Sequence, residues 1–165
     1  MIISLTGFMG CGKSSVGRRL ATLLEGYEFI DLDSLIEDKE CRSISAIIEE
    51  DGIETFRNLE YKHLSAILNT EADIVLSLGG GTVTTPECEE MIRSKTVCFY
   101  LDASAEKLEQ NLSGSTSRPL LKGGPERMLE LLKERIPIYE RVSHHVIETE
   151  GKYPMEIARE ISDLL

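Results

Sequence analysis

Short runs of apolar residues alternate along the chain with stretches in which apolar residues recur every three to four positions. The continuous runs IVLSL and TVCFYL are typical of strands that are buried on both faces of a parallel sheet. The periodic stretches predict helices, and in one of them a shared apolar face is formed by Phe56, Leu59, His63, Ile67 and Leu68. The alternation predicts an α/β fold, a three-layer sandwich built on a five-stranded parallel sheet. The predicted strands are 2–5, 29–31, 74–78, 97–101 and 145–148.

Two segments depart from this alternation. Residues 34–70 hold several helical patterns before the next strand, and we interpret them as a helical insertion that forms a substrate pocket. Residues 111–124, NLSGSTSRPLLKGG, are rich in Gly and Ser, which is typical of a disordered loop or a functional lid. Because the chain shows no internal repeat and no linker, residues 1–165 are predicted to form a single domain.

The charge of the chain restricts its partners. Lys and Arg number 18 against 29 Asp and Glu, so the formal net charge is −11. No basic stripe interrupts this acidic composition, which argues against nucleic acid as a partner. A small anionic ligand remains compatible with it, because a few local cations and backbone dipoles can overcome the overall charge.

The cysteines and the apolar runs indicate where the protein resides. Cys11, Cys41, Cys88 and Cys98 form no CxxC pair, which argues against a zinc site or a redox dithiol and indicates reduced thiols. The opening MIISLTGF lacks the cationic lead and long apolar run of a secretory leader. No apolar stretch approaches the ~20 residues that span a bilayer. We therefore expect a cytoplasmic protein without a membrane segment.

Residues 7–14, GFMGCGKS, match the phosphate-binding pattern GxxxxGK[ST] in full, between an apolar strand and an amphipathic helix. Glycines let the backbone turn its N–H groups toward phosphate oxygens, and the helix that begins there adds the positive end of its dipole. Lys13 is expected to reach the β- and γ-phosphates of ATP, and the Ser14 hydroxyl to ligate Mg²⁺. The further expected contacts to ATP are Gly10, Cys11, Gly12 and Ser15.

The phosphate loop does not by itself identify the phosphate acceptor. A GTPase would carry a guanine-reading NKxD motif, which is absent. Asp31 and Asp33 end the second predicted strand, and alternation points both carboxylates toward the crevice at the carboxyl ends of the strands. Asp31 is expected to hold Mg²⁺ through water and Asp33 to bind a substrate hydroxyl. Asp33 could equally cap the helix that follows, and the two roles are compatible.

Two further segments contain candidates for the acceptor site. Arg57 lies one position from the apolar face of its helix, with Glu60 three residues on to brace it, although it could be simply solvated. Gly79, Gly80 and Gly81, which have no side chains, directly follow a predicted buried strand. Such a turn either brings backbone N–H groups close to a ligand or makes a tight bend, and three glycines in succession favour the ligand.

Two arginines complete the candidates. Arg118 lies in the Gly/Ser-rich segment, where it is either solvated or placed to stabilise charge on a transferring phosphoryl group. Arg135 comes two residues before Pro137, which is expected to end or kink its helix nearby. The end of a helix can present an arginine to a pocket, or the arginine can complement the helix dipole. Taken singly, each arginine is ambiguous.

Together these segments resemble the shikimate kinase family. The resemblance is carried, in order and with similar spacing, by GFMGCGKSSVG (7–17), DLD (31–33), FRNLE (56–60), SLGGGTV (77–83), SRPLL (117–121) and ERIPIYERV (134–142). It implies a P-loop NTPase fold of the nucleoside monophosphate kinase type with a mobile lid. It also implies phosphorylation of shikimate to shikimate 3-phosphate by ATP with Mg²⁺, a step toward chorismate and the aromatic amino acids.

The resemblance implies a role for each candidate residue. Asp33 would bind the ring hydroxyls and act as base. Arg57 and Arg135 would clamp the carboxylate, with the glycine turn alongside, because a guanidinium matches a carboxylate bidentately. Arg118 would be the lid arginine that acts on ATP. The expected catalytic residues are thus Lys13, Asp33 and Arg118.

Two positions depart from the family, and two other functions stay open. Many members carry Glu where this chain has Ile53. Where the family commonly has an arginine that stacks on adenine, this chain has Asn111, so the nucleotide affinity and base preference are left open. The chain could phosphorylate another small hydroxy acid such as gluconate, or it could be a nucleotide-binding regulator without catalysis. Lys13, Ser14, Asp33 and Arg118 argue against a regulator. The expected partners are ATP and shikimate, and the expected state is a monomer.

Overall fold

A computed structural model describes residues 1–113 and 123–165 of the chain. At its centre lies a sheet of five parallel strands in the order β2-β3-β1-β4-β5. The strands are β1 (Ile2–Thr6), β2 (Glu28–Asp31), β3 (Ile74–Ser77), β4 (Val97–Asp102) and β5 (His145–Glu148). Each agrees with its predicted strand to within one residue at either end, so the predicted five-stranded parallel sheet is confirmed.

The burial of each strand follows its place in the sheet. Every residue of β1 and β3 is buried, as expected for inner strands that are covered on both faces. The outer strands β2 and β5 carry exposed residues. The continuous apolar runs in the sequence therefore mark the middle of the sheet.

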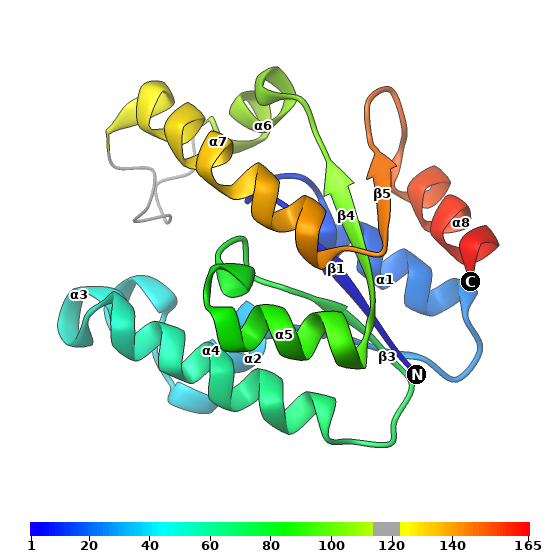
Figure 1. Ribbon diagram of the computed structural model, residues 1–165, viewed down its shortest axis with the longest axis horizontal. Coiled ribbons are helices and arrows are strands. Elements are labelled where there is room, and N and C mark those ends of the chain that lie inside the picture. The colour runs from blue at the N-terminus through cyan, green and yellow to red at the C-terminus, as the bar shows by residue number, and fades with distance from the viewer. Residues whose placement is uncertain (114–122) are drawn as a thin grey trace.

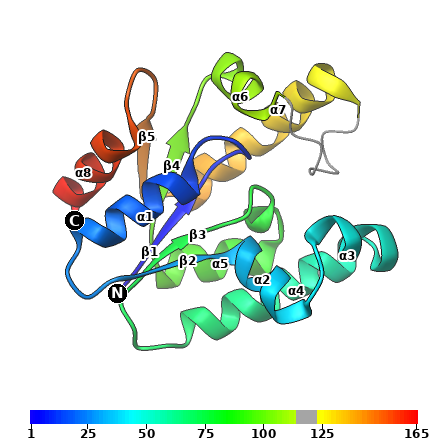
Figure 2. The ribbon, with the colours of Figure 1, turned by 180° about the vertical axis from the view of Figure 1, so that it is seen from behind.

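Helices cover both faces of the sheet. They are α1 (Lys13–Leu23), α2 (Leu32–Glu40), α3 (Ile44–Asp51), α4 (Ile53–Leu68), the 3-10 turn η1 (Thr82–Thr84), α5 (Pro86–Lys95), α6 (Ala105–Leu112), α7 (Gly124–Val142) and α8 (Pro154–Leu164). Figures 1 and 2 show α1 and α8 against one face, and α4, α5 and α7 against the other. The chain is thus a three-layer sandwich, and three helices, α2 to α4, lie between β2 and β3. In the ranges that the structure describes, no helix combines the length and apolarity that a membrane span requires.

Two helices differ in detail from the sequence prediction. In α4 the buried positions are Phe56, Glu60, Leu64, Ile67 and Leu68. The predicted Leu59 is partly buried and packs against the core, and the predicted His63 is partly buried. The helix α7 does not end near Pro137 but continues to Val142. Pro137 is exposed, so the carbonyl that loses its helical partner there lies on the side that water can reach.

Candidate active site

A cleft of about 700 Å³ opens at the edge of the sheet where β1, β2 and β3 end. Because the carboxyl ends of parallel strands share one edge, the loop that follows each strand can contribute to a single site. The sequence-predicted residues that line this cleft are Gly10, Gly12, Lys13, Ser14, Ser15, Asp31, Asp33, Arg57, Gly79, Gly80, Gly81, Asn111 and Arg135. Segments far apart in the chain therefore meet around one space.

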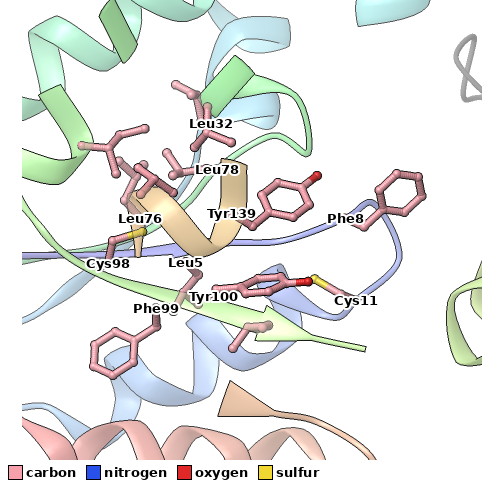
Figure 3. Close-up of a cluster of buried hydrophobic side chains, with 14 of the residues drawn as sticks. Leu5, Phe8, Cys11, Leu32, Leu76, Leu78, Cys98, Phe99, Tyr100 and Tyr139 are labelled. Carbon is pink, nitrogen blue, oxygen red and sulfur yellow. The ribbon is translucent and has the colours of Figure 1, made fainter. Parts of the chain in front are cut away.

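Among the described residues, Cys11 is the predicted site residue that is not found in the lining. Cys11 is only 7% exposed, and its backbone N–H donates to the carbonyl oxygen of Phe8 at 3.2 Å. Figure 3 shows the Cys11 sulfur directed toward the buried ring of Tyr100. Cys11 thus supports the phosphate loop from behind. Arg118 lies outside the described residues, as do residues 114–122 of the predicted lid at 111–124.

The phosphate loop has the backbone that its glycines allow. Gly10 and Gly12 have φ angles of +85° and +95°, a region that other residues rarely adopt. The helix α1 begins at Lys13, so its unpaired N–H groups and its dipole lie at the cleft. The Nζ atom of Lys13 donates to the carbonyl oxygens of Gly7 at 2.9 Å and Phe8 at 3.0 Å. The loop therefore gathers backbone donors and one ammonium group at a single anion-binding point.

Ser14 and Asp31 form a pair beside this loop. The Ser14 hydroxyl donates to Oδ2 of Asp31, and Oδ1 of Asp31 accepts the backbone N–H of Ser34 at 3.1 Å, which caps α2. A hydroxyl and a carboxylate are the hard oxygen ligands that Mg²⁺ combines with phosphate oxygens and water. The two side chains therefore fit a magnesium ion that arrives with a nucleotide.

Asp33 reaches the cleft in a different way from the prediction. The strand β2 ends at Asp31 and α2 begins at Leu32, so strand alternation does not orient Asp33, and the helix cap is Asp31. Asp33 instead projects from the first turn of α2, and its buried Oδ1 has no hydrogen-bond partner in residues 1–113 and 123–165. Burial, and next the negative charge of Glu60, raise the pKa of Asp33 to about 6.

Glu60 organises the next group of side chains. It is only 1% exposed; its Oε1 accepts from Nη1 of Arg57 at 2.5 Å, and its Oε2 accepts from the Thr82 hydroxyl at 2.5 Å. A Cβ at Gly81 would overlap the guanidinium of Arg57, so a side chain there would displace Arg57 from its position. Arg57 is therefore held against the glycine turn by a buried carboxylate, as the (i, i+3) spacing suggested.

Arg135 faces the same space from α7. It is 4% exposed, and its Nε and Nη1 atoms have no hydrogen-bond partner within the described part of the chain. Burial lowers the pKa of its guanidinium, and the nearby charge of Arg57 lowers it further. A buried cation with unused donors beside a second cation is costly without an anion. The pair of arginines therefore indicates a site for an anionic ligand.

The sequence reasoning missed several members of the site. Thr82 holds Glu60, and Tyr139 donates its hydroxyl to the carbonyl oxygen of Gly80 at 2.5 Å. Ile44 and Ile48 of α3 line the far end of the cleft. Tyr139 lies four residues after Arg135, so helical spacing could have placed it on the same face. Nothing in the sequence singled out Thr82.

Asn111 lies on the phosphate-loop side of the cleft. Its Nδ2 atom donates to the carbonyl oxygen of Gly10 at 2.8 Å, which joins the end of α6 to the phosphate loop. The adjacent Leu112 packs so closely on Gly10 that a Cβ there would lie 3.0 Å from its side chain. The last turn of α6 therefore supports the loop directly.

Sequence comparison relates the chain to known kinases. The family model described as "Shikimate kinase" matches residues 9–165. The chain is 40% identical to the shikimate kinase of Dictyoglomus turgidum over 166 residues, which cover 99% of this chain and 96% of that protein. It is 45% identical to the shikimate kinase of Chlorobaculum tepidum over 148 residues, covering 84% of this chain and 76% of that protein.

Structure comparison gives the same relatives. The shikimate kinase from Acinetobacter baumannii in complex with shikimate matches with a TM-score of 0.94 at 36% identity, covering 99% of this chain and 91% of that one. The shikimate kinase from Aquifex aeolicus matches with a TM-score of 0.86 at 33% identity, covering 98% and 94%. The similarity in sequence and in fold therefore extends over nearly the whole of these chains.

Proposed function

The chain belongs to the shikimate kinase family, whose members phosphorylate a hydroxyl group at the expense of ATP, and we propose that its cleft holds ATP at the phosphate loop and shikimate beside Asp33, Arg57 and Arg135. The observation that carries this assignment is the meeting of two anion-binding sets in one cleft. One set is the loop with Lys13, and the other is the pair of arginines beside an unpaired carboxylate. The first suits a triphosphate and the second a hydroxylated carboxylic acid.

The acceptor is recognised by charge and by hydrogen bonds. The shikimate carboxylate lies between Arg57 and Arg135, where it supplies the partner that the buried guanidinium of Arg135 lacks. The backbone of the turn 79–81 borders the same space. We propose that the helices α2 to α4 form the acceptor half of the cleft, with Ile44 and Phe56 covering the apolar ring face.

Phosphoryl transfer follows from this arrangement. Oδ1 of Asp33 accepts the proton of the shikimate hydroxyl while the hydroxyl oxygen bonds to the γ-phosphorus. The bond from the γ-phosphorus to the bridging oxygen breaks, and ADP leaves with that bridging oxygen. Lys13 and the N–H groups of α1 stabilise the charge on the phosphate oxygens. Ser14 and Asp31 would hold Mg²⁺, which when bound would supply further charge neutralisation. Arg118, outside the described residues, keeps the role that the resemblance implies, stabilisation of the transferred group.

The chain itself supports two further proposals. The described residues of a single chain form both anion-binding sets of the cleft, so we propose that a monomer is sufficient for activity. We also propose that the protein resides in the cytoplasm. All four cysteines are free thiols, as is usual in that reducing environment: Cys11, Cys41, Cys88 and Cys98.

The decisive experiment measures ADP release from ATP and Mg²⁺ with shikimate, with gluconate, and with no acceptor. We expect release that depends on shikimate and little release with gluconate, because the family to which the chain belongs is that of the shikimate kinases. Equal or faster release with gluconate would transfer the assignment to that acid. ATP binding without turnover on either acid would support a regulator instead.

Asn111 provides a test of the nucleotide side. We expect Asn111→Ala to raise the KM for ATP about 2- to 10-fold, because one neutral hydrogen bond that fixes Gly10 is lost. If Asn111 acts through the loop, binding of inorganic tripolyphosphate weakens by the same factor as binding of ATP, since that probe has no base. A loss confined to ATP would instead indicate a contact with the base. The KM for shikimate should not change.

Glu60 provides a test of the acceptor side. We expect Glu60→Gln to raise the KM for shikimate about 3- to 10-fold, because Arg57 loses its charged partner. The same substitution removes a negative charge that raises the pKa of Asp33, so the acidic limb of the activity profile should shift to lower pH. Kinetics as a function of pH measure both effects. Glu130→Gln on the exposed surface of α7 is the control and should change neither.

A further inference from the structure

A buried tyrosine is hydrogen-bonded to the glycine turn that borders the acceptor side of the cleft. Tyr139 is fully buried, and its hydroxyl donates to the carbonyl oxygen of Gly80 at 2.5 Å. Its ring packs against Tyr100, with ring centroids 5.2 Å apart, and Figure 3 shows Tyr139 between Leu78, which directly follows β3, and Phe8 of the phosphate loop. Packing on these sides fixes the ring, so the hydroxyl has one position available to it.

Gly80 occupies a place where small displacements matter. A Cβ there would lie 3.2 Å from the backbone nitrogen of Met9 and 3.6 Å from Nη1 of Arg135. The turn therefore sits between the phosphate loop and the buried guanidinium. A shift of this turn would change the distance between the two substrate sites as well as the donors that face the acceptor.

The helix α7 supplies two groups to this region from one face. Arg135 and Tyr139 are four residues apart, and both are buried. Arg135 lines the cleft, whereas Tyr139 does not and reaches it through its bond to Gly80 and its side-chain contact with Arg135. The relative position of the guanidinium and the glycine turn is therefore fixed by a single rigid helix.

We propose that Tyr139 is a positioning residue of the phosphoryl transfer, whose hydroxyl holds the turn 79–81 at the distance from Arg135 and the phosphate loop that the acceptor requires. This proposal rests on the function proposed above, in which the turn borders the acceptor. Tyr139 does not touch either substrate. Its contribution is made through the Gly80 carbonyl, whose bond to the tyrosine hydroxyl cannot be replaced by the apolar neighbours.

The test compares Tyr139→Phe with Tyr100→Phe. Each substitution removes one hydroxyl from a buried ring of the same pair, but the Tyr100 hydroxyl contacts Oδ1 of Asp102, at 3.4 Å, rather than the turn. We expect Tyr139→Phe to raise the KM for shikimate about 3- to 10-fold, while the KM for ATP stays within about 2-fold of wild type. Tyr100→Phe should keep the wild-type KM for shikimate. Thermal unfolding of both variants measures the structural contribution separately.

A second variant approaches the same turn from the other side. Gly80→Ala places a methyl group against the Met9 nitrogen and should also raise the KM for shikimate, even if Tyr139→Phe does not fold. A wild-type KM for shikimate in Tyr139→Phe or in Gly80→Ala would overturn the proposal, as would equal changes in Tyr139→Phe and Tyr100→Phe. Failure of the proposed function is distinguishable, because the wild-type protein would then release no ADP with shikimate.

Discussion

Replacing Arg135 with methionine is expected to lower kcat/KM for shikimate about 10- to 150-fold and, at the same time, to raise the melting temperature. The loss follows from removal of a charged hydrogen-bond pair with the acceptor carboxylate, worth ~1.5–3 kcal/mol. The gain follows because the guanidinium is 4% exposed with two nitrogens unpartnered, so its burial is unfavourable until an anion binds. Methionine keeps most of the volume without the charge.

The direction of the change in melting temperature separates a role of Arg135 in binding the acceptor from a role in the core, which a loss of activity alone does not. For a domain of this size, each kcal/mol gained corresponds to roughly 2–4 °C. Saturating shikimate should raise the melting temperature of the wild-type protein and have little effect on Arg135→Met. Arg141→Met on the same helix is the control, since Arg141 is exposed and paired with Glu89. A less stable Arg135→Met with unchanged kinetics would show that Arg135 serves the core and not the acceptor.

The contrast with Arg57 sharpens the assignment. Arg57→Ala should weaken shikimate to a similar extent, with little change for ATP, but it should lower stability because Glu60 is left buried without its cation. Breaking a buried ion pair from one side costs about 3 kcal/mol or more. The two arginines therefore serve one ligand under opposite structural conditions. An unchanged KM for shikimate in Arg57→Ala would refute the clamp.

The features that the sequence predicted correctly are those governed by local or repetitive chemistry. The strands were recognisable because β1 and β3 are buried on both faces and read as continuous apolar runs. The phosphate loop was recognisable because its glycines, lysine and serine are close in the chain and need only the strand and helix on either side. The pairing of Arg57 with Glu60 required only helical spacing.

The features that were missed depend on boundaries and on tertiary contacts. The alternation of side chains along a strand does not apply to Asp33, because the strand β2 ends at Asp31 and the helix α2 begins at Leu32. Pro137 suggested a helix end, but α7 continues past it. The free-energy cost of a proline inside a helix depends on how exposed the position is, and the local sequence does not reveal that exposure. Thr82 and Tyr139 act through partners 22 and 59 residues away, a separation that no local pattern encodes.

Asp33 carries the prediction with the widest range of effect. Asp33→Asn is expected to lower kcat about 10²- to 10⁴-fold, the range of a lost general base, because the amide keeps the shape but accepts no proton. In the wild-type protein kcat/KM for shikimate should rise with pH through about 6, where the buried carboxyl loses its proton. Initial rates from pH 5 to 8 measure this limb, which should vanish in Asp33→Asn. Asp163→Asn, an exposed substitution on α8, should keep the wild-type profile.

Stability should run in the opposite direction through the same range of pH. Because the pKa of Asp33 is raised from 3.8 to about 6 in the folded state, the folded protein holds a proton that the unfolded chain gives up between these values. The stabilising contribution of this group is therefore fully present below about pH 4 and is lost as pH rises through about 6. Above pH 6 Asp33 is a carboxylate whose buried Oδ1 has no hydrogen-bond partner among the described residues, which destabilises the fold but leaves an oxygen that can accept a proton. Asp33→Asn should remove this dependence and raise the melting temperature near pH 8, and a variant that loses activity with no such gain would place the effect of Asp33 in packing rather than in proton transfer.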